Sequence, residues 1–192
     1  MVDVGFGGDG PIVPVPLIDG QVTQNIGSQQ IRMVHGSIPL QTTGTEGEDE
    51  NKKLWIFQNR NGTDRPWNSF YSFPEIEFFQ QDFEHLNFFI SRSPDSFQTY
   101  RLLIVKFLRR AREEADSGDT STLPDVIYGK VMLVNGDVKL NTGGRTSIVK
   151  TCVTEEERVE ALREYFGITL SDEEKESIRG FSTELGVGNP FR

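Results

Sequence analysis

Residues that commonly carry chemistry are scarce in this sequence, whose 192 residues include one cysteine and two histidines. A single cysteine cannot form an internal disulfide, and this set is too small for a zinc site of the cysteine and histidine type. No run of about 18 apolar residues occurs, so no segment is expected to span a membrane. The first residues also lack the basic and apolar regions of a secretory signal peptide. The sequence therefore predicts a cytoplasmic protein with no metal and no disulfide.

Positive charge is also in short supply, because 20 Lys and Arg stand against 29 Asp and Glu, giving a net charge of −9. A nucleic-acid binder needs clustered Lys and Arg to neutralise phosphates, and docking on anionic lipid needs basic segments. We expect neither nucleic acid nor a membrane surface as a partner. The 14 Phe, 2 Trp and 4 Tyr, by contrast, supply bulky core side chains for one domain or two small ones.

The first part of the chain has the pattern of β-strands and turns. Gly, Pro and Val are frequent up to residue 40, and apolar and polar residues alternate at 30–36. Further strands are expected at 54–58 and 67–73. Between them, residues 41–53 contain no large apolar side chain, which predicts an exposed loop or the tip of a β-hairpin.

A helix is predicted over residues 75–90, where apolar residues recur at intervals of three and four. That spacing lays one apolar stripe along a helix. Three further phenylalanines widen the stripe, so we expect this helix to be well buried. The stripe consists of Ile76, Phe79, Phe83, Leu86 and Ile90, widened by Phe78, Phe88 and Phe89.

The second half mixes strands with helices. A strand is expected at 100–107, a charged surface insertion at 109–124, and a β-hairpin over 127–140 that turns at Asn135-Gly136. Thr154 and Ser171 each precede a glutamate by three positions, which is the capping box of a helix start, and Gly167 ends the first helix. Because strands and helices do not alternate as βαβ units, the order predicts an α+β fold of antiparallel character.

Asp3 is the clearest candidate for a functional side chain, because it is a charged residue between two valines. A carboxylate inside a core costs several kcal/mol unless it is paired. The glycines that follow would let the backbone approach another group closely. The alternative is that Asp3 lies in a turn or a frayed terminus and has no role.

Several motifs occur in an order that resembles the arylamine N-acetyltransferase family, most closely its fungal members. Val-Asp-Val-Gly-Phe-Gly opens at residue 2, Asp-Phe-Glu-His-Leu-Asn lies at 82–87, and Ser-Pro-Asp-Ser lies at 93–96. Tyr-Ser-Phe at 71–73 and the helix at 154–162 continue the match. The resemblance covers most of the chain, and the segments 41–53 and 109–124 match least.

The resemblance implies ping-pong acyl transfer. A cysteine thiolate takes an acetyl group from acetyl-CoA as a thioester, and the nitrogen of an arylamine or hydrazine then attacks it. By the resemblance, Asp3 is the carboxylate of a Cys-His-Asp triad and orients the histidine. Positions that line the cleft or the acyl-CoA and acceptor pocket are matched by Phe6, Gly7, Ser93, Asp95 and Ser96.

The implied architecture is a β-barrel-like domain at 1–74, a connecting helix and loop at 75–96, and an α/β lid at 97–192. The family's Arg-Gly-Gly-x-Cys segment and its triad histidine would lie upstream of Met1, with the N-terminal helical domain. The chain is therefore expected to be the C-terminal portion of an acetyltransferase, inactive alone and able to self-associate through the surface left bare. Asp95 also departs from the small hydroxyl residue of the family, which weakens a direct CoA contact there.

The cysteine and histidines that are present match no catalytic position of the family. We interpret Cys152 as a half-buried structural thiol, and His35 and His85 as structural or surface residues. A triad rebuilt from these residues and Asp3 is compatible with their spacing, but nothing favours it. The alternative function is a non-catalytic homologue that binds CoA, an arylamine or a partner chain. The sequence also leaves open whether the donor is acetyl-CoA or a longer one such as malonyl-CoA.

Overall fold

The computed structural model describes residues 1–3, 5–39, 41–42, 53–111 and 125–186. Most of the predicted loop at 41–53 and of the insertion at 109–124 lies outside these described residues. The chain forms two compact units, each described below by itself. The first comprises Met1–Glu77, Arg109–Tyr128 and Thr142–Gly144, and the second comprises Phe78–Leu108, Gly129–Asn141 and Arg145–Arg192.

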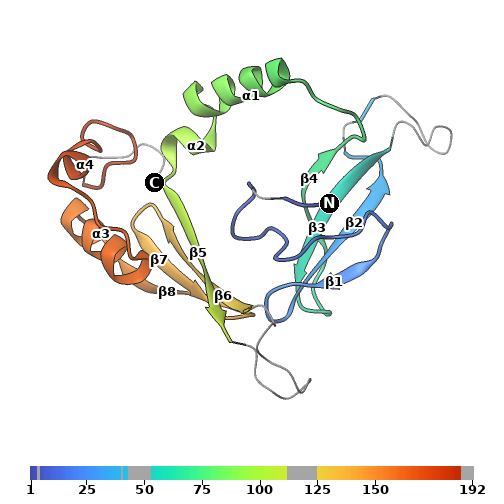
Figure 1. Cartoon of the computed structure of the whole chain (residues 1–192), viewed down its shortest axis with the longest axis horizontal. Helices are drawn as coiled ribbons and strands as arrows, with labels where there is room; N and C mark the ends of the chain where they lie inside the picture. The colour runs from blue at the N-terminus through green and yellow to red at the C-terminus, as the bar shows by residue number, and fades with distance from the viewer. Residues whose placement is uncertain (4, 40, 43–52, 112–124, 187–192) are drawn as a thin grey trace. The chain divides into compact units, whose positions relative to one another are not determined.

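The first unit contains a four-stranded antiparallel sheet in the order β1-β2-β3-β4 (Figure 1). Its strands are β1 (Val22–Gln24), β2 (Gln29–Gly36), β3 (Leu54–Asn61) and β4 (Asn68–Phe73). Alternate residues of β2, Ile31 and Met33, are fully buried, while Arg32 between them is not. This period of two puts one face of the sheet against the core and leaves the other to solvent. The strands predicted at 30–36, 54–58 and 67–73 are confirmed.

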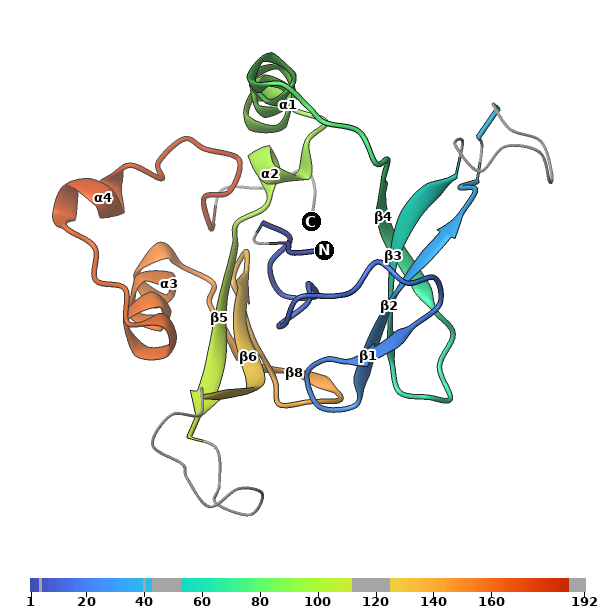
Figure 2. The same cartoon turned by 45° about the vertical axis from the view of Figure 1, so that its right-hand side comes forward.

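The core of this unit gathers on one face of the sheet. Phe57, Ile31 and Met33 are fully enclosed, and Val15 joins them from the segment before β1. Burying each such side chain contributes about 1.5–3 kcal/mol. Residues 5–15, dark blue in Figures 1 and 2, lie beside this sheet. The Val15 amide donates to the Met1 carbonyl at 2.9 Å.

A buried asparagine holds the N-terminal segment in place. The Asn25 side-chain amide donates to the Gly10 carbonyl at 3.1 Å and to Gln29 Oε1 at 2.6 Å, while its oxygen accepts from the Ile12 amide at 3.0 Å. Because Asn25 is almost fully buried, each of these bonds replaces one to water that folding removes. The N-terminal segment is therefore fixed at Gly10 and Ile12 to the connection between β1 and β2.

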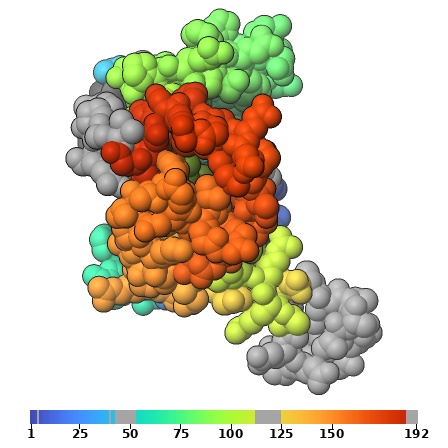
Figure 3. Space-filling view, turned by 90° about the vertical axis from the view of Figure 1, so that its left-hand side faces the viewer, coloured from blue at the N-terminus to red at the C-terminus, as the bar shows by residue number. Residues whose placement is uncertain are grey.

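The second sheet is antiparallel, in the order β5-β6-β7-β8. Its strands are β5 (Leu103–Arg110), β6 (Val126–Val134), β7 (Asp137–Asn141) and β8 (Thr146–Thr151). The helix α3 (Glu155–Ala161) continues as a π-helical turn, η3 (Leu162–Phe166), and a short helix α4 (Asp172–Glu176) follows. Figure 3 shows the face that α3 and α4 cover, orange to red. Leu133, Val138, Ala161 and Phe166 meet in the core between this sheet and its helices.

Local signals in this part of the chain are largely confirmed. Ser171 and Glu174 form a complete capping box at α4. Thr154 accepts from the Glu157 amide, but the Glu157 carboxylate accepts from Val153 rather than from the Thr154 amide. Gly167 closes η3 with a φ of 72°, the left-handed value that suits glycine.

Four expectations were wrong. Both sheets are open, with four strands each, so the described residues form no closed barrel. The predicted helix is α1 (Gln80–Arg92), which begins five residues later than expected and has no buried residue. Its neighbour is α2 (Phe97–Tyr100), which precedes a strand that begins at Leu103 rather than at residue 100. The apolar stripe is present, and its side chains are exposed.

Membrane-spanning helices and metal-ion clusters are both absent from the described residues. No helix among them is both long enough and apolar enough to cross a membrane. In the same residues, no group of three or more His, Cys, Asp or Glu side chains could hold a metal ion.

Candidate functional site

The candidate site is built around the carboxylate of Asp3. Its Oδ1 accepts from the backbone amides of Gly5 and Phe6, each at 3.0 Å, which closes a tight turn at the start of the chain. Its Oδ2 accepts from the Tyr71 hydroxyl on β4 at 2.5 Å. A hydroxyl that donates to an ionised carboxylate makes a charge-assisted hydrogen bond, which is stronger than one between neutral groups. Three donors thus fix both oxygens of one carboxylate.

These contacts set the charge of the pair. Partial burial raises the pKa of Asp3, but the Tyr71 hydroxyl and the Gly5 and Phe6 amides outweigh it, so the pKa lies below its ordinary value. Burial raises the pKa of Tyr71, and the hydrogen bond to Asp3 and the charge of Asp3 raise it further. Asp3 is therefore an anion and Tyr71 a neutral donor at neutral pH.

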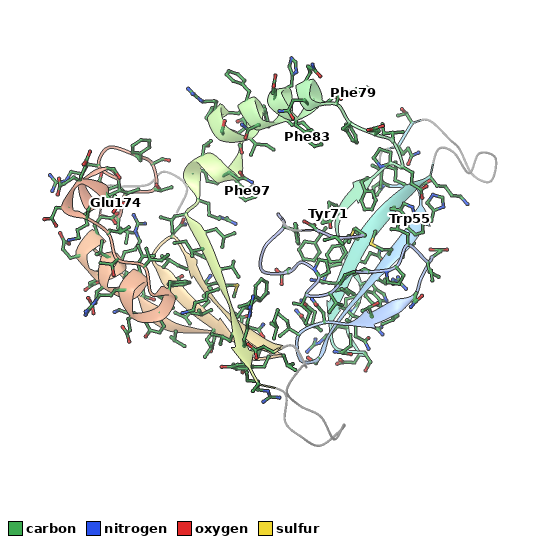
Figure 4. The ribbon with its side chains drawn as sticks, in the orientation of Figure 1. Trp55, Tyr71, Phe79, Phe83, Phe97 and Glu174 are labelled. Carbon is green, nitrogen blue, oxygen red and sulfur yellow. The ribbon has the colours of Figure 1, made fainter. Side chains whose placement is uncertain are left out.

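A shallow hollow of about 400 Å³ opens beside this pair. Figure 4 shows Tyr71 on the first sheet, from which its hydroxyl reaches Asp3. An anion at the edge of such a hollow can accept an N–H from a group that enters it. The hollow is lined by Met1, Val2, Asp3, Gly5, Tyr71 and Phe73.

Phe6 and Gly7 lie in the same turn but outside that lining. The Phe6 ring meets those of Phe70 and Tyr71 edge-on, with centroids 5.2 and 5.1 Å away, and so packs Tyr71 in place. Gly7 has a φ of 78° and its carbonyl accepts from the Gly10 amide at 3.0 Å. A side chain would strain that backbone. Phe6 and Gly7 therefore support the turn around Asp3 and do not line the hollow.

Ser93, Asp95 and Ser96 lie together in the second unit, in the loop between α1 and α2. The Ser93 carbonyl accepts from the Ser96 amide at 3.0 Å and from the Thr99 hydroxyl at 2.9 Å. Ser96 is buried, whereas Asp95 is exposed. The loop is held by its own hydrogen bonds, and it offers the Asp95 carboxylate to solvent.

The cysteine and histidines have other surroundings. Cys152 is fully rather than half buried, and burial raises the pKa of its thiol, an effect that Lys150 only partly offsets. Its Sγ donates to the Glu157 carbonyl at 3.5 Å. The His35 ring lies 4.8 Å from the Trp55 ring, and His85 lies on exposed α1. Among the described residues, no histidine donates to Asp3.

Tyr71 is the site residue that we did not predict from the sequence. Alternation in β4 places it on the same side as Phe73, which indicates a core position. Its partner Asp3 is 68 residues away in the chain. No sequence pattern pairs a tyrosine with an aspartate over such a distance, so only the folded sheet reveals it.

The amino-acid sequence is similar to those of known acyltransferases. A sequence model described as N-acetyltransferase matches residues 1–175. The chain is 31% identical over 183 residues to the N-malonyltransferase FDB2 of Fusarium pseudograminearum, covering 93% of this chain and 49% of that protein. The chain thus spans about half the length of this curated relative.

Solved structures share the fold. The arylamine N-acetyltransferase of Mycobacterium abscessus matches with a TM-score of 0.64 at 17% identity, over 88% of this chain and 50% of that one. The arylamine N-acetyltransferase of Mycobacterium marinum in complex with CoA matches with a TM-score of 0.56 at 20% identity, over 87% and 48%. The fold of this chain, with its two antiparallel sheets, is therefore one already seen in solved structures.

Proposed function

Because this chain belongs to the N-acetyltransferase family, whose sequence model covers residues 1–175, we propose that it takes part in acyl transfer from an acyl-CoA to an amine nitrogen. The observation that carries the proposal is the Asp3 carboxylate. It is ionised, held by three donors, and placed at the edge of a hollow. A rigid anion in that position suits the orientation of an imidazole.

The proposed role of Asp3 follows from triad chemistry. A carboxylate that accepts from imidazole Nδ1–H fixes the tautomer and stabilises the imidazolium that forms when the ring takes a thiol proton. The thiolate attacks the thioester carbonyl of acyl-CoA, and the CoA sulfur leaves with a proton from the imidazolium. The amine nitrogen then attacks the new thioester, and the cysteine sulfur leaves as the amine proton passes to the imidazole.

We propose that the thiol and the imidazole belong to a region equivalent to the half of the Fusarium N-malonyltransferase that these 192 residues do not match. Cys152 is a poor nucleophile, because burial raises its pKa and the reactive species is the thiolate. The non-catalytic alternative rests on the same observation. In that case the chain would bind CoA, an arylamine or a partner chain without forming an acyl-cysteine.

The donor and acceptor are also proposals. The relative named above is an N-malonyltransferase, and one solved neighbour was determined with CoA. We propose acetyl-CoA or malonyl-CoA as the donor and an arylamine or hydrazine as the acceptor. Phe6 and Gly7 would shape the cleft near Asp3. Ser93, Asp95 and Ser96 would contact the donor or the acceptor.

The test joins the 192 residues to the half of the Fusarium N-malonyltransferase that they do not match. The fusion is incubated with acetyl-CoA or malonyl-CoA and an arylamine, and the amide product is measured. We expect transfer, with Asp3→Asn lowering kcat about a thousandfold or more, because the neutral amide cannot stabilise an imidazolium. Asp64→Asn, at an exposed aspartate of the same unit, should leave the rate unchanged.

Two outcomes would contradict these assignments. Unchanged transfer by a folded Asp3→Asn fusion would remove Asp3 from the triad. An acyl group found on Cys152 of the chain alone by mass spectrometry, and lost when the arylamine is added, would show that Cys152 is the nucleophile after all.

A further inference from the structure

Two arginines share one tryptophan on the solvent face of the first sheet. The guanidinium carbons of Arg32 on β2 and Arg60 on β3 lie 4.2 and 4.4 Å from the ring centroid of Trp67. All three side chains are partly exposed. Arg32 stands between the buried residues Ile31 and Met33, so it projects from the face opposite the core. We refer to Arg32, Arg60 and Trp67 as the Arg-Trp cluster.

Each arginine is held by the glutamine directly opposite it in the sheet. In the β2–β3 register, Arg32 faces Gln58 and Gln30 faces Arg60. Arg32 Nε donates to Gln58 Oε1, and Arg60 Nε donates to Gln30 Oε1, each at 2.8 Å. Because the Nε position is occupied in both, the terminal forks are oriented before any ligand arrives. Such preorganisation reduces the entropy lost on binding.

Terminal N–H groups of the two guanidinium forks remain available as hydrogen-bond donors. Arg60 Nη1 donates to the Thr63 carbonyl at 3.2 Å, and the other terminal nitrogens of the two arginines have no partner among the described residues. The Trp67 indole N–H likewise donates to no described residue. Several N–H donors therefore remain available at one place on the surface.

No ion pair within the described part of the chain involves the two arginines of the Arg-Trp cluster. No described carboxylate pairs with Arg32 or Arg60, although the protein carries a net charge of −9. Burial lowers the pKa of Arg32, the charge of Arg60 lowers it further, and Asp19 opposes both. The nearby Arg65, by contrast, lies 3.7 Å from Asp64. An anion would relieve the repulsion between the two guanidinium groups.

We propose that the Arg-Trp cluster is a binding site for a phosphate monoester. Two guanidinium charges match the charge of about −1.5 to −2 that a phosphate monoester carries near neutral pH. Guanidinium forks suit phosphate oxygens, because two parallel N–H donors can meet two oxygens. The Trp67 ring also offers an aromatic surface beside the anion. This inference needs only residues of the first unit, and it does not depend on the acyltransfer proposal.

The ligand could come from two sources that share this chemistry. CoA carries a phosphate monoester on its ribose, and free phosphate or another small phosphate ester is the second source. The CoA source rests on the proposed function, because acyl-CoA is the donor there. Comparison of CoA with dephospho-CoA, which lacks that phosphate, separates the two sources.

The first experiment follows the indole N–H signals of the unmodified chain by NMR during titration with inorganic phosphate at low salt. The chain has two tryptophans, so two indole signals report. We expect the Trp67 signal to move in a saturable way. The Trp55 signal should stay in place, because Trp55 is buried and its indole N–H donates to Glu75. No movement of Trp67 with phosphate, CoA or dephospho-CoA would overturn the proposal.

Variants then assign the site. Arg32→Gln and Arg60→Gln should each weaken phosphate binding at least about tenfold, because each removes charge-assisted hydrogen bonds. Arg65→Gln is the matched control, since Arg65 is a neighbouring arginine that does not stack on Trp67 in the described structure, and it should bind as the unmodified chain does. Equal weakening by all three variants would indicate general charge attraction and would overturn the proposal.

Solution pH supplies a readout that needs no variant. The second proton of a phosphate monoester leaves at a pH of about 6, whereas arginine stays charged throughout. Binding should therefore tighten as the pH rises from about 5 to about 7.5, a range that spans this value. Affinity that is independent of pH over this range would contradict recognition of a dianion. If CoA binds more tightly than dephospho-CoA and Arg60→Gln removes this difference, CoA is the source. Equal binding of CoA and dephospho-CoA would identify the second source, free phosphate or another small phosphate ester.

Discussion

Asp3 and Tyr71 are better understood as one group than as two residues. The hydroxyl donates to the carboxylate, so each shifts the proton equilibrium of the other, lowering the pKa of Asp3 and raising that of Tyr71. The Phe6 ring packs against Tyr71 and limits the positions its hydroxyl can take. Precise support of this kind is what a charged side chain needs if it is to orient a second group.

Tyr71→Phe tests this coupling, because it removes the hydroxyl and keeps the ring. We expect the pKa of Asp3 to rise, measured from its carboxyl signal in an NMR pH titration. The free energy of unfolding at pH 7 should fall by about 1 kcal/mol, since Asp3 is partly exposed to solvent and screening weakens the bond.

The sign of the pH dependence follows from the lowered pKa of Asp3. A carboxyl whose folded-state pKa is lowered adds stability above its unfolded-state value, here ordinarily 3.8, and loses it as the pH falls through the folded-state value. The difference between the unmodified chain and Tyr71→Phe should therefore be largest near neutral pH and shrink in acid. An Asp3 pKa that does not change in the variant would contradict the coupling.

The sequence indicated Asp3 for a reason that the structure explains only in part. A charged residue between valines followed by glycines suggested a constrained carboxylate, and the local turn with Gly5 and Phe6 is of that kind. The third donor could not be predicted, because it depends on how β4 lies beside the N-terminal segment. Short-range patterns report bonds between near neighbours, whereas Tyr71 is brought to Asp3 by the pairing of strands.

At the scale of elements, the hairpin between β6 and β7 shows why a correct prediction can rest on an incomplete reason. Asn135-Gly136 was expected to turn because both residues tolerate positive φ. Asn135 has a φ of 54°, but Gly136 is not among the residues with positive φ. Glycine is needed at 136 because a Cβ there would lie 2.4 Å from the Cys152 carbonyl oxygen.

Gly136→Ala should therefore destabilise the second unit. The obstacle is a backbone atom, so the hairpin or the strand end at Cys152 must shift, at a cost of about 1–3 kcal/mol. Chemical denaturation of the variant measures this. Gly36→Ala at the end of β2 is the control, because a Cβ there meets nothing within 4 Å. Equal stability of the two variants would show that the close approach at Gly136 is not a constraint.

The sequence predicted the elements well and the burial of α1 poorly. Periodicity and caps depend on residues within a few positions of one another, so β2, the β6–β7 hairpin and the Ser171 cap could be located. An apolar stripe shows which side of a helix would face a partner, and it does not show that a partner is there. Strand patterns likewise do not show which strands pair at the edges of a sheet, so the sequence could not distinguish two open sheets from a barrel.

For the molecule as a whole, α1 presents several exposed apolar side chains. The side chains of Phe83 and Phe88 are 54% and 69% exposed. Figure 4 shows Phe79 and Phe83 projecting from the helix. Apolar patches of this kind are uncommon on monomeric proteins and often mark a contact surface. We propose that isolated chains associate with one another through α1.

Replacement of two of these phenylalanines tests that proposal. The unmodified chain should bind a hydrophobic dye and show a mass in light scattering that rises with concentration. Phe83→Ser with Phe88→Ser should reduce both effects and change the free energy of unfolding by no more than about 0.5 kcal/mol, because exposed side chains contribute little to the fold. Phe181→Ser, at another exposed phenylalanine, should leave both effects in place. A chain that stays monomeric and binds no dye would refute the association.

Because the two sheets have separate cores, one part of the protein can unfold while the other stays folded. Phe57 and its neighbours enclose one cluster, and Leu133 and its neighbours enclose another. Proteins with more than one core can open in parts, and the least stable part opens most often. The hydrogen-bond partners of Asp3 lie in the first unit, so opening of that unit would disrupt the candidate site even where the second sheet stays folded. A protease or chaperone would then meet a half-folded chain rather than an unfolded one.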